Sequence, residues 1–476
     1  MISKSKQRRL VKVILLIGLM FINKNVYSQD FGEQKPIILA LRGEKHKVSC
    51  GGPITFLSAY ALPKGTYKTE EKWSYKPLFL KEEKIVFEKP KVLFVPGEYK
   101  VGLQIKNDKG IWSEPEYTII TVEDKCKQSE IDYVVENNIK GVVMNHFGQI
   151  DYRTYKRLDS YDEECMPGKL IISNSPEKVK ETGILYEGTS TGVGRLLVHH
   201  LNALEEKKDY RIVILATNLS EKKQKVHINN LAIKGPCQDV LYVGEQLLLD
   251  YWDEKGRAVF YNLPPKVTGV IYKQDTTWQK GDAISAYIDF DTTEEIKWTV
   301  ACVKNGDNLS DFLRYCEKDE HIRGTFDGLK KKFTIILPEG EPTYLSLGED
   351  KEAYLKGYDE ITGEAVYDKG DFGVQYELKM KASEETAVVL NPRGDVFKGA
   401  IHWNGEGVYP IPKKGYMKGV NEASFLGIVE AGKEVDLRYM LPNGSSAPVL
   451  IVFLPKSCWK GKMSNLNEIW KSYKPY

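Results

Sequence analysis

The sequence lacks the short motifs that mark nucleotide-dependent and zinc-dependent enzymes. It contains neither a Gly-Lys-Ser/Thr phosphate loop nor a Gly-x-Gly-x-x-Gly turn, so the use of a nucleotide is unsupported. It also has no Cys-x-x-Cys and no His-Glu-x-x-His, which argues against a zinc ribbon, a dithiol redox site and the common type of zinc protease. We therefore expect no cofactor.

A large excess of charge of one sign is also absent. The formal net charge is +2 over 476 residues, and a near-neutral surface of mixed sign argues against nucleic acid as a partner. Residues 1–28 hold six basic side chains and no acidic one, so the remaining chain has 62 basic and 66 acidic side chains, a net charge of −4.

Only one long hydrophobic run occurs, at residues 13–22, and a membrane span needs about 20 apolar residues. This run follows a basic head and ends near the small residue Ser28, which predicts a secretory signal peptide over residues 1–28. We expect a mature chain without a transmembrane segment that is secreted or cell-wall-associated.

Cysteines are few, and their seven positions are widely spaced. Secretion permits disulfides, and Cys50 and Cys126 bracket the first expected domain and could pair, while several of the other thiols are expected to be free. Cys302 alternates with Trp298 and Val300, so it is expected to be a small buried hydrophobic residue.

The features that are present favour β structure. The chain has 40 Gly and 28 Tyr but few long helical periodicities, and its strand and turn signals recur at the spacing of about 8–12 residues that sandwiches produce. We predict an all-β fold of tandem antiparallel β-sandwich (Ig/PKD-like) domains with a short, partly helical linker. The expected parts are a sandwich at 35–124, a linker at 125–168 with a helix at 129–138, sandwiches at 169–320 and 321–456, a short helix at 310–316 and a tail at 457–476.

The clearest strand is residues 99–106, in which Tyr99, Val101, Leu103 and Ile105 alternate with polar residues. Pro-Gly precedes it, a turn ending at Gly110 follows, and residues 117–122 supply the returning strand. Trp73 is expected to be the core aromatic residue of the opposite sheet. This stretch resembles a PKD-type immunoglobulin-like repeat, although the family's Phe-Gly-Asp-Gly turn is missing. The resemblance implies a spacer or a module that contacts carbohydrate or protein.

A second resemblance covers residues 170–455. The segments 175–177, 183–186, 194–202, 235–236 and 323–326 are similar to secreted proteins of Gram-positive bacteria, some of which carry a copper amine oxidase N-terminal stalk module. The resemblance implies a surface or wall-associated role and no established activity. The stalk module itself and the oxidase Asn-Tyr-Asp/Glu signature are absent.

The sharpest catalytic candidate is Ser190, in the Gly-Thr-Ser-Thr-Gly pentapeptide 188–192, which matches the Gly-x-Ser-x-Gly nucleophile elbow. The elbow needs a strand before the serine and a helix after it, and residues 195–204 show one helical face. However, Glu187 would place a charge at the end of a buried strand, and no His-Gly-Gly motif accompanies it. A hairpin turn is the preferred interpretation.

Two further clusters suggest metal binding. His199 and His200 would point to opposite faces of a strand, so an ion would need His227 or another partner. The preferred interpretation is therefore one half-buried and one surface histidine without a metal. Asp289 and Asp291 share a face and are candidates for a calcium site or an acid pair, although solvated acids at a strand end are more common.

Four tryptophans are candidates for a sugar-stacking platform: Trp112, Trp252, Trp278 and Trp403. The preferred function is a non-catalytic, secreted or wall-associated protein that binds a cell-wall glycan or a surface protein. A basic, aromatic C-terminal tail leaves electrostatic association with an anionic wall polymer open. The alternatives are a serine hydrolase that uses Ser190 and a calcium-stabilised adhesin centred on Asp289 and Asp291.

Overall fold

The computed structural model describes residues 35–81, 83–145, 150–253, 258–307, 314–349 and 354–459. The chain divides into two compact units after Lys125. The predicted signal peptide, most of the expected helix at 310–316 and most of the tail lie outside the described residues. None of the described helices is long and apolar enough to cross a membrane.

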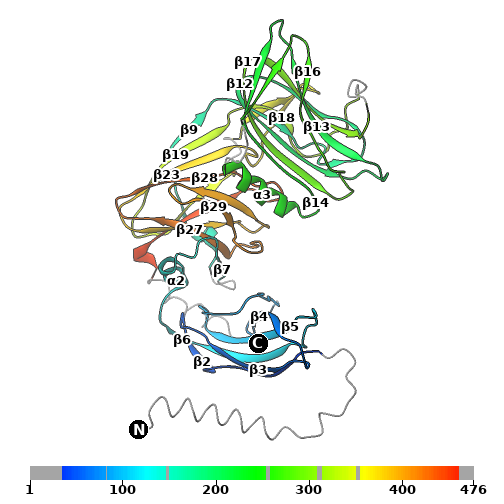
Figure 1. Ribbon diagram of the computed structural model, residues 1–476. Helices are drawn as coiled ribbons and strands as arrows, with labels where there is room; N and C mark the ends of the chain where they lie inside the picture. Colours follow the sequence, from blue (N-terminus) through cyan, green and yellow to red (C-terminus); the bar gives the residue numbers. More distant parts are fainter. Residues whose placement is uncertain are drawn as a thin grey trace, which may run out of the picture. The chain divides into compact units, whose positions relative to one another are not determined.

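The first unit is built from two small sheets. One has two strands, β1 and β3, and the other has the strand order β2-β6-β5-β4 (Figure 1). The bounds are β1 Ile37–Gly43, β2 Lys47–Cys50, β3 Phe56–Ala61, β4 Lys68–Pro77, β5 Gly97–Asn107 and β6 Glu116–Cys126.

Its core confirms the pattern expected around residue 100. Tyr99, Val101, Leu103 and Ile105 of β5 are all at most 1% exposed. Trp73 is buried as expected, but it lies on β4, which pairs with β5 in the same sheet, so its assignment to the opposite sheet was wrong. The periodicity of a strand predicts which residues are buried but not which strand lies beside it. Cys50 and Cys126 are disulfide-bonded, and the other five cysteines are free.

The second unit contains a sandwich of two six-stranded sheets. The first, called the outer sheet, has the order β26-β25-β28-β23-β19-β9, and the second has the order β7-β27-β24-β29-β20-β8. Side chains from both sheets share one core that includes Phe333, Leu378, Val388 and Phe453. The bounds are β7 Val143–Asn145, β8 Lys156–Arg157, β9 Asp162–Met166, β19 Lys330–Leu337, β20 Thr343–Leu347, β23 Gln375–Ala382, β24 Thr386–Asn391, β25 Gly399–Trp403, β26 Gly407–Ile411, β27 Glu422–Val429, β28 Glu434–Tyr439 and β29 Val449–Pro455.

The same unit also holds an eleven-stranded sheet, drawn mostly in green in Figure 1, whose longest strands are β12 and β17. Residues 283–304 form one continuous strand, β17. Cys302 is fully buried with Trp298 and Val300, as predicted. The bounds are β10 Lys169–Ser173, β11 Lys178–Val179, β12 Gly183–Asn202, β13 Tyr210–Asn218, β14 Gln224–Cys237, β15 Val259–Leu263, β16 Thr268–Lys273, β17 Ala283–Lys304, β18 Arg323–Asp327, β21 Lys356–Asp359 and β22 Glu364–Tyr367.

Two α-helices cover sheet faces. The expected helix at 129–138 is α2, Glu130–Glu136, and Ser129 caps it through a reciprocal capping box with Asp132. Helix α3, Val240–Trp252, contacts β14 and β17 on one side and β25 and β26 on the other (Figure 1). Two short 3₁₀ turns, Tyr152–Thr154 and Lys456–Cys458, complete the described elements.

The sheets do not follow the expected domain limits. The segment expected to be a linker supplies β7, β8 and β9 to the sandwich sheets, and β18, β21 and β22 extend the eleven-stranded sheet beyond the expected boundary at 320. The pairing is also mixed rather than purely antiparallel, because β19 pairs with β23 in parallel. A connection of more than 30 residues, which holds β20, β21 and β22, joins these two strands and makes parallel pairing possible.

Candidate functional site

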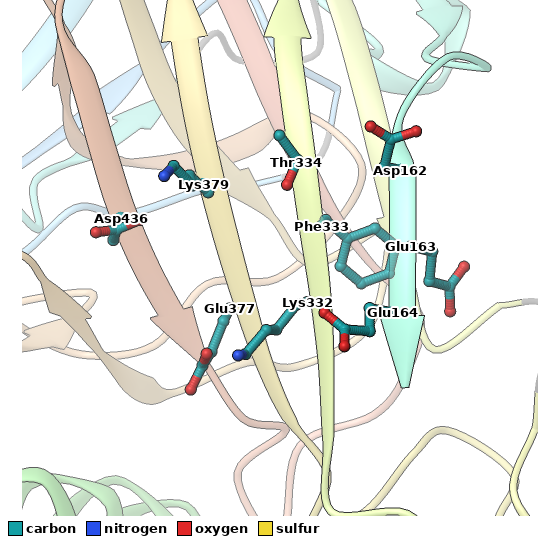
Figure 2. Close-up of a pocket in the computed structure, with 9 residues that line it drawn as sticks. All are labelled: Asp162, Glu163, Glu164, Lys332, Phe333, Thr334, Glu377, Lys379 and Asp436. Atoms are coloured by element: carbon teal, nitrogen blue, oxygen red, sulfur yellow. The ribbon is translucent and has the colours of Figure 1, made fainter. Parts of the chain in front are cut away.

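The outer sheet leaves part of its solvent-facing surface open. Along β19, Phe333, Ile335 and Leu337 point into the sandwich core, so Lys332 and Thr334 point outward. Their neighbours on β9, β23 and β28 do the same. Together they form a groove of about 300 Å³, here called the sheet groove, which is lined by Asp162, Glu163, Glu164, Lys332, Phe333, Thr334, Glu377, Lys379 and Asp436 (Figure 2).

The register of the four strands arranges the groove side chains in two rows. Lys332 lies opposite Glu164 on one side and Glu377 on the other. In the second row, Thr334 lies between Asp162 and Lys379. Neighbouring strands lie about 4.8 Å apart, so both rows bring acidic and basic groups side by side, and the second row adds the hydroxyl of Thr334. Figure 2 shows these side chains standing on the face of the sheet.

Some groove residues are already held by protein partners. Glu377 Oε1 lies 3.2 Å from Lys330 Nζ and accepts a 2.7 Å hydrogen bond from Gln375 Nε2. Burial raises the pKa of Glu377, but these partners outweigh it and hold the pKa below the ordinary value. The ion pair with Glu434 raises the pKa of Lys379. The carboxylate of Glu377 and the amine of Lys379 are therefore both charged at neutral pH.

Other groove residues keep their hydrogen-bonding capacity. Within the described ranges, the side chains of Asp162, Glu164, Lys332 and Thr334 make no hydrogen bond. Asp436 accepts one bond of 3.2 Å from Asn404 Nδ2. The groove therefore presents free acceptors and donors on a rigid sheet. Phe333 supplies no stacking surface, because it is only 5% exposed.

The sequence pointed to parts of this site without assembling them. Tyr376, Leu378 and Met380 alternate with charged residues, and residues 162–164 are all acidic. No local pattern shows that β9 pairs with β19 across more than 150 residues. The groove could therefore not be predicted from the sequence.

Ser190 lies in the interior of β12, and its hydroxyl accepts a 2.9 Å hydrogen bond from Trp298 Nε1. The residue is 4% exposed. The segment at 195–204, considered above as a helix, continues β12 as far as Asn202, so the strand–turn–helix geometry of a nucleophile elbow is not formed here. The preferred prediction of a hairpin turn at 188–192 was also wrong, because these residues lie inside the same strand.

Replacing Ser190 with alanine tests this structural role. Without the serine oxygen, the buried Trp298 N–H loses its acceptor, so we expect the free energy of unfolding to fall by about 1–3 kcal/mol. Chemical denaturation measures this loss, with the exposed neighbour Thr191→Ala as the control. Equal stability of both variants would contradict the role, and labelling of wild type but not Ser190→Ala by a fluorophosphonate would instead support a hydrolase.

The histidines do not form a common metal site. His199 Nδ1 lies 2.5 Å from Ser285 Oγ, whereas His200 lies 2.9 Å from Ser173 Oγ and 2.8 Å from the Pro176 carbonyl oxygen. Both rings are buried, so the prediction that one of them lies at the surface was wrong. Burial lowers the pKa of His199 to about 3 and that of His200 to about 4, so both rings are neutral. His227 stacks on Phe260 instead, with ring centroids 4.1 Å apart.

Asp289 and Asp291 have different surroundings. Asp289 accepts hydrogen bonds from Arg195 Nε at 2.7 Å and from the Tyr251 hydroxyl at 2.7 Å, so the charge of its carboxylate is already balanced by Arg195. Asp291 is exposed and lies opposite His227. The described residues hold one group of three potential metal ligands elsewhere, Asp319 with its two successors. Asp319 already accepts bonds from Ser175 Oγ and two backbone amides.

The tryptophans do not form an exposed platform. Trp252, Trp278 and Trp403 are 8%, 0% and 2% exposed, and Trp112 is half-buried. A tryptophan-rich sequence does not distinguish core from surface, because these rings pack readily into sandwich cores.

Comparisons with known proteins assign no family. No protein-family model matches the chain, so neither the PKD nor the copper amine oxidase resemblance is supported at that level, and no curated protein matches it. Among solved structures, a carbohydrate-binding module of the β-sandwich superfamily is 10% identical, covering 57% of this chain and 97% of its own, with a TM-score of 0.15.

Two α-L-rhamnosidase structures are also similar. The enzyme from Aspergillus terreus is 8% identical and that from Dictyoglumus thermophilum 12% identical, and each match covers 88% of this chain, 49% of the enzyme, with a TM-score of 0.15. The chain thus spans about half the length of these enzymes. The all-β class rests on the strands described above, because TM-scores this low carry no argument.

Proposed function

We propose that the protein is a secreted, non-catalytic binding protein that contacts glycans through the sheet groove. The observation that carries the proposal is the groove itself, an open polar surface in which carboxylates, amines and a hydroxyl alternate along two rows. Sugar hydroxyls both donate and accept hydrogen bonds, so one glycan can satisfy acidic and basic neighbours together.

The charge of the lining narrows the class of glycan. Five carboxylates and two lysines line the groove, so the net lining is acidic. A polyanion would meet like charges there, which disfavours the anionic wall polymer considered above as the ligand of this surface. We therefore favour neutral polysaccharides. The predicted signal peptide supports a location outside the cell.

Retention on insoluble polysaccharides tests the proposal. Thr334→Trp fills the middle of the groove, whereas Ile336→Trp adds the same bulk two residues along the same face, outside the lining. We expect wild type and Ile336→Trp to be retained saturably on at least one of cellulose, xylan, mannan or peptidoglycan. Losing a few hydrogen bonds should weaken Thr334→Trp about tenfold or more.

Two outcomes would contradict the proposal. Retention of Thr334→Trp equal to that of wild type would remove the groove as the binding surface. Absence of retention of wild type on all four matrices would remove glycan binding and favour a protein partner.

A further inference from the structure

The sheet groove has no exposed aromatic ring, but another surface of the same unit has two. Tyr358 on β21 is 64% exposed, and Tyr367 on β22 is 47% exposed. These strands end the eleven-stranded sheet, and β22 is its edge.

The register places both tyrosines on one face. Tyr358 lies opposite Ala365 and Lys356 lies opposite Tyr367, so the two rings are diagonal neighbours. Diagonal neighbours of an antiparallel pair have Cα atoms about 7–8 Å apart, which sets two rings side by side without burying either.

Polar groups continue the same face across the next strands. Thr325 on β18 lies opposite Tyr358, and Asp327 is the next outward residue on that strand. Lys169 Nζ lies 2.6 Å from Asp327 Oδ1. The surface formed by Tyr358, Tyr367, Lys356, Ala365 and Asp327, here called the tyrosine platform, thus combines ring faces with donors and an acceptor.

The backbone under the platform is firmly held. Next to Tyr358, Asp359 forms a buried 2.9 Å ion pair with Arg323, and both side chains are at most 4% exposed. The Tyr186 hydroxyl donates a 3.3 Å hydrogen bond to the Tyr358 carbonyl oxygen. Gly357 approaches β18 so closely that a Cβ there would lie 2.3 Å from the Thr325 carbonyl oxygen. A rigid presentation lowers the entropy lost on binding.

We propose that the tyrosine platform is a second glycan-binding site, which binds neutral oligosaccharides by stacking of sugar rings on Tyr358 and Tyr367. Tyrosine suits this role because its ring is apolar on its faces and polar at its tip. The mixed charges of the platform match the neutral hydroxyls of a sugar better than they match a polyanion. Two rings and one alanine are also too small an apolar area for a stable protein interface.

The inference rests on the proposed function and adds a second contact within the same unit. When two sites on one folded unit bind the same polysaccharide, the avidity of the protein for that polysaccharide rises without new contacts at either site. Removing either site alone should therefore weaken retention of the protein on the polysaccharide.

Calorimetric titration with cellohexaose, xylohexaose and mannohexaose tests the platform. We expect Tyr358→Ala/Tyr367→Ala to bind the recognised hexasaccharide about tenfold to a hundredfold more weakly, and Tyr358→Phe/Tyr367→Phe to bind it like wild type. Tyr416→Ala, which removes a 57% exposed tyrosine elsewhere, is the control and should not change binding. Equal thermal unfolding of all variants is expected, because these side chains are exposed.

The outcomes separate the two sites. If the alanine pair binds like wild type while Thr334→Trp does not, the platform is overturned and the groove stands. If the alanine pair loses binding while Thr334→Trp keeps it, the platform stands and the groove fails. Loss of binding in the phenylalanine pair would overturn the stacking mechanism. No binding of any hexasaccharide by wild type would overturn the platform, whereas retention on the four insoluble matrices decides the proposed function.

Discussion

Replacing Arg195 with methionine is expected to lower the free energy of unfolding by about 3 kcal/mol. The guanidinium is 2% exposed and donates to Asp289 through Nε at 2.7 Å and Nη2 at 3.1 Å, and to the Gly373 carbonyl oxygen at 2.7 Å. Without Arg195, the Asp289 carboxylate loses its counter-ion. Its side chain keeps 24% exposure, so water compensates in part and the loss lies at the lower end for buried pairs.

Denaturant unfolding measures this change. The control is Arg438→Met, which removes the same group from an exposed position on β28 and should cost less than about 1 kcal/mol. A loss for Arg195→Met no larger than that of the control would show that the buried network does not stabilise the fold.

Replacing Gly244 with alanine is expected to destabilise the protein by about 2 kcal/mol, although alanine in a helix interior is intrinsically favoured by about 1 kcal/mol. Gly244 lies in α3 where the helix meets the turn at 442–444, and a Cβ there would lie 2.1 Å from the Asn443 carbonyl oxygen. The clash is with backbone, so either the helix or the turn must move, and overpacking of this kind costs about 1–3 kcal/mol or more.

Thermal unfolding of Gly244→Ala and of Gln246→Ala, a half-buried position on the same helix, distinguishes the two effects. Gln246→Ala should unfold near the wild-type temperature. A rise in the unfolding temperature of Gly244→Ala would mean that helix propensity outweighs the contact and that α3 is not tightly seated.

Much of the local structure could be predicted from the sequence. The alternation at 99–106 identified the buried face of β5, and the helix expected at 129–138 is present as α2. Cys50 and Cys126, both disulfide-bonded, were the two expected to pair. Each of these features depends on near neighbours or on one strong physical preference.

Pairing between distant strands could not be predicted. The residues of β9 read as a polar linker, yet they form the edge of the outer sheet because β19 offers them an unpaired neighbour. The exposure of aromatic side chains could not be predicted from the sequence either. Trp278 and Tyr358 are both aromatic residues in β-rich sequence, but Trp278 is fully buried and Tyr358, on the strand next to the sheet edge, is 64% exposed.

The sheet groove is proposed to bind a glycan without cleaving it. This must be tested because carboxylates, which line the groove, are also the catalytic groups of glycoside hydrolases. The most direct measurement is the release of reducing ends from the polysaccharide that retains the protein, followed over time alongside binding. We predict saturable binding that Thr334→Trp weakens about tenfold or more, and no reducing ends above the protein-free control. Release of reducing ends by wild type, lost in Glu377→Gln, would contradict the account and make the groove the active site of a glycoside hydrolase.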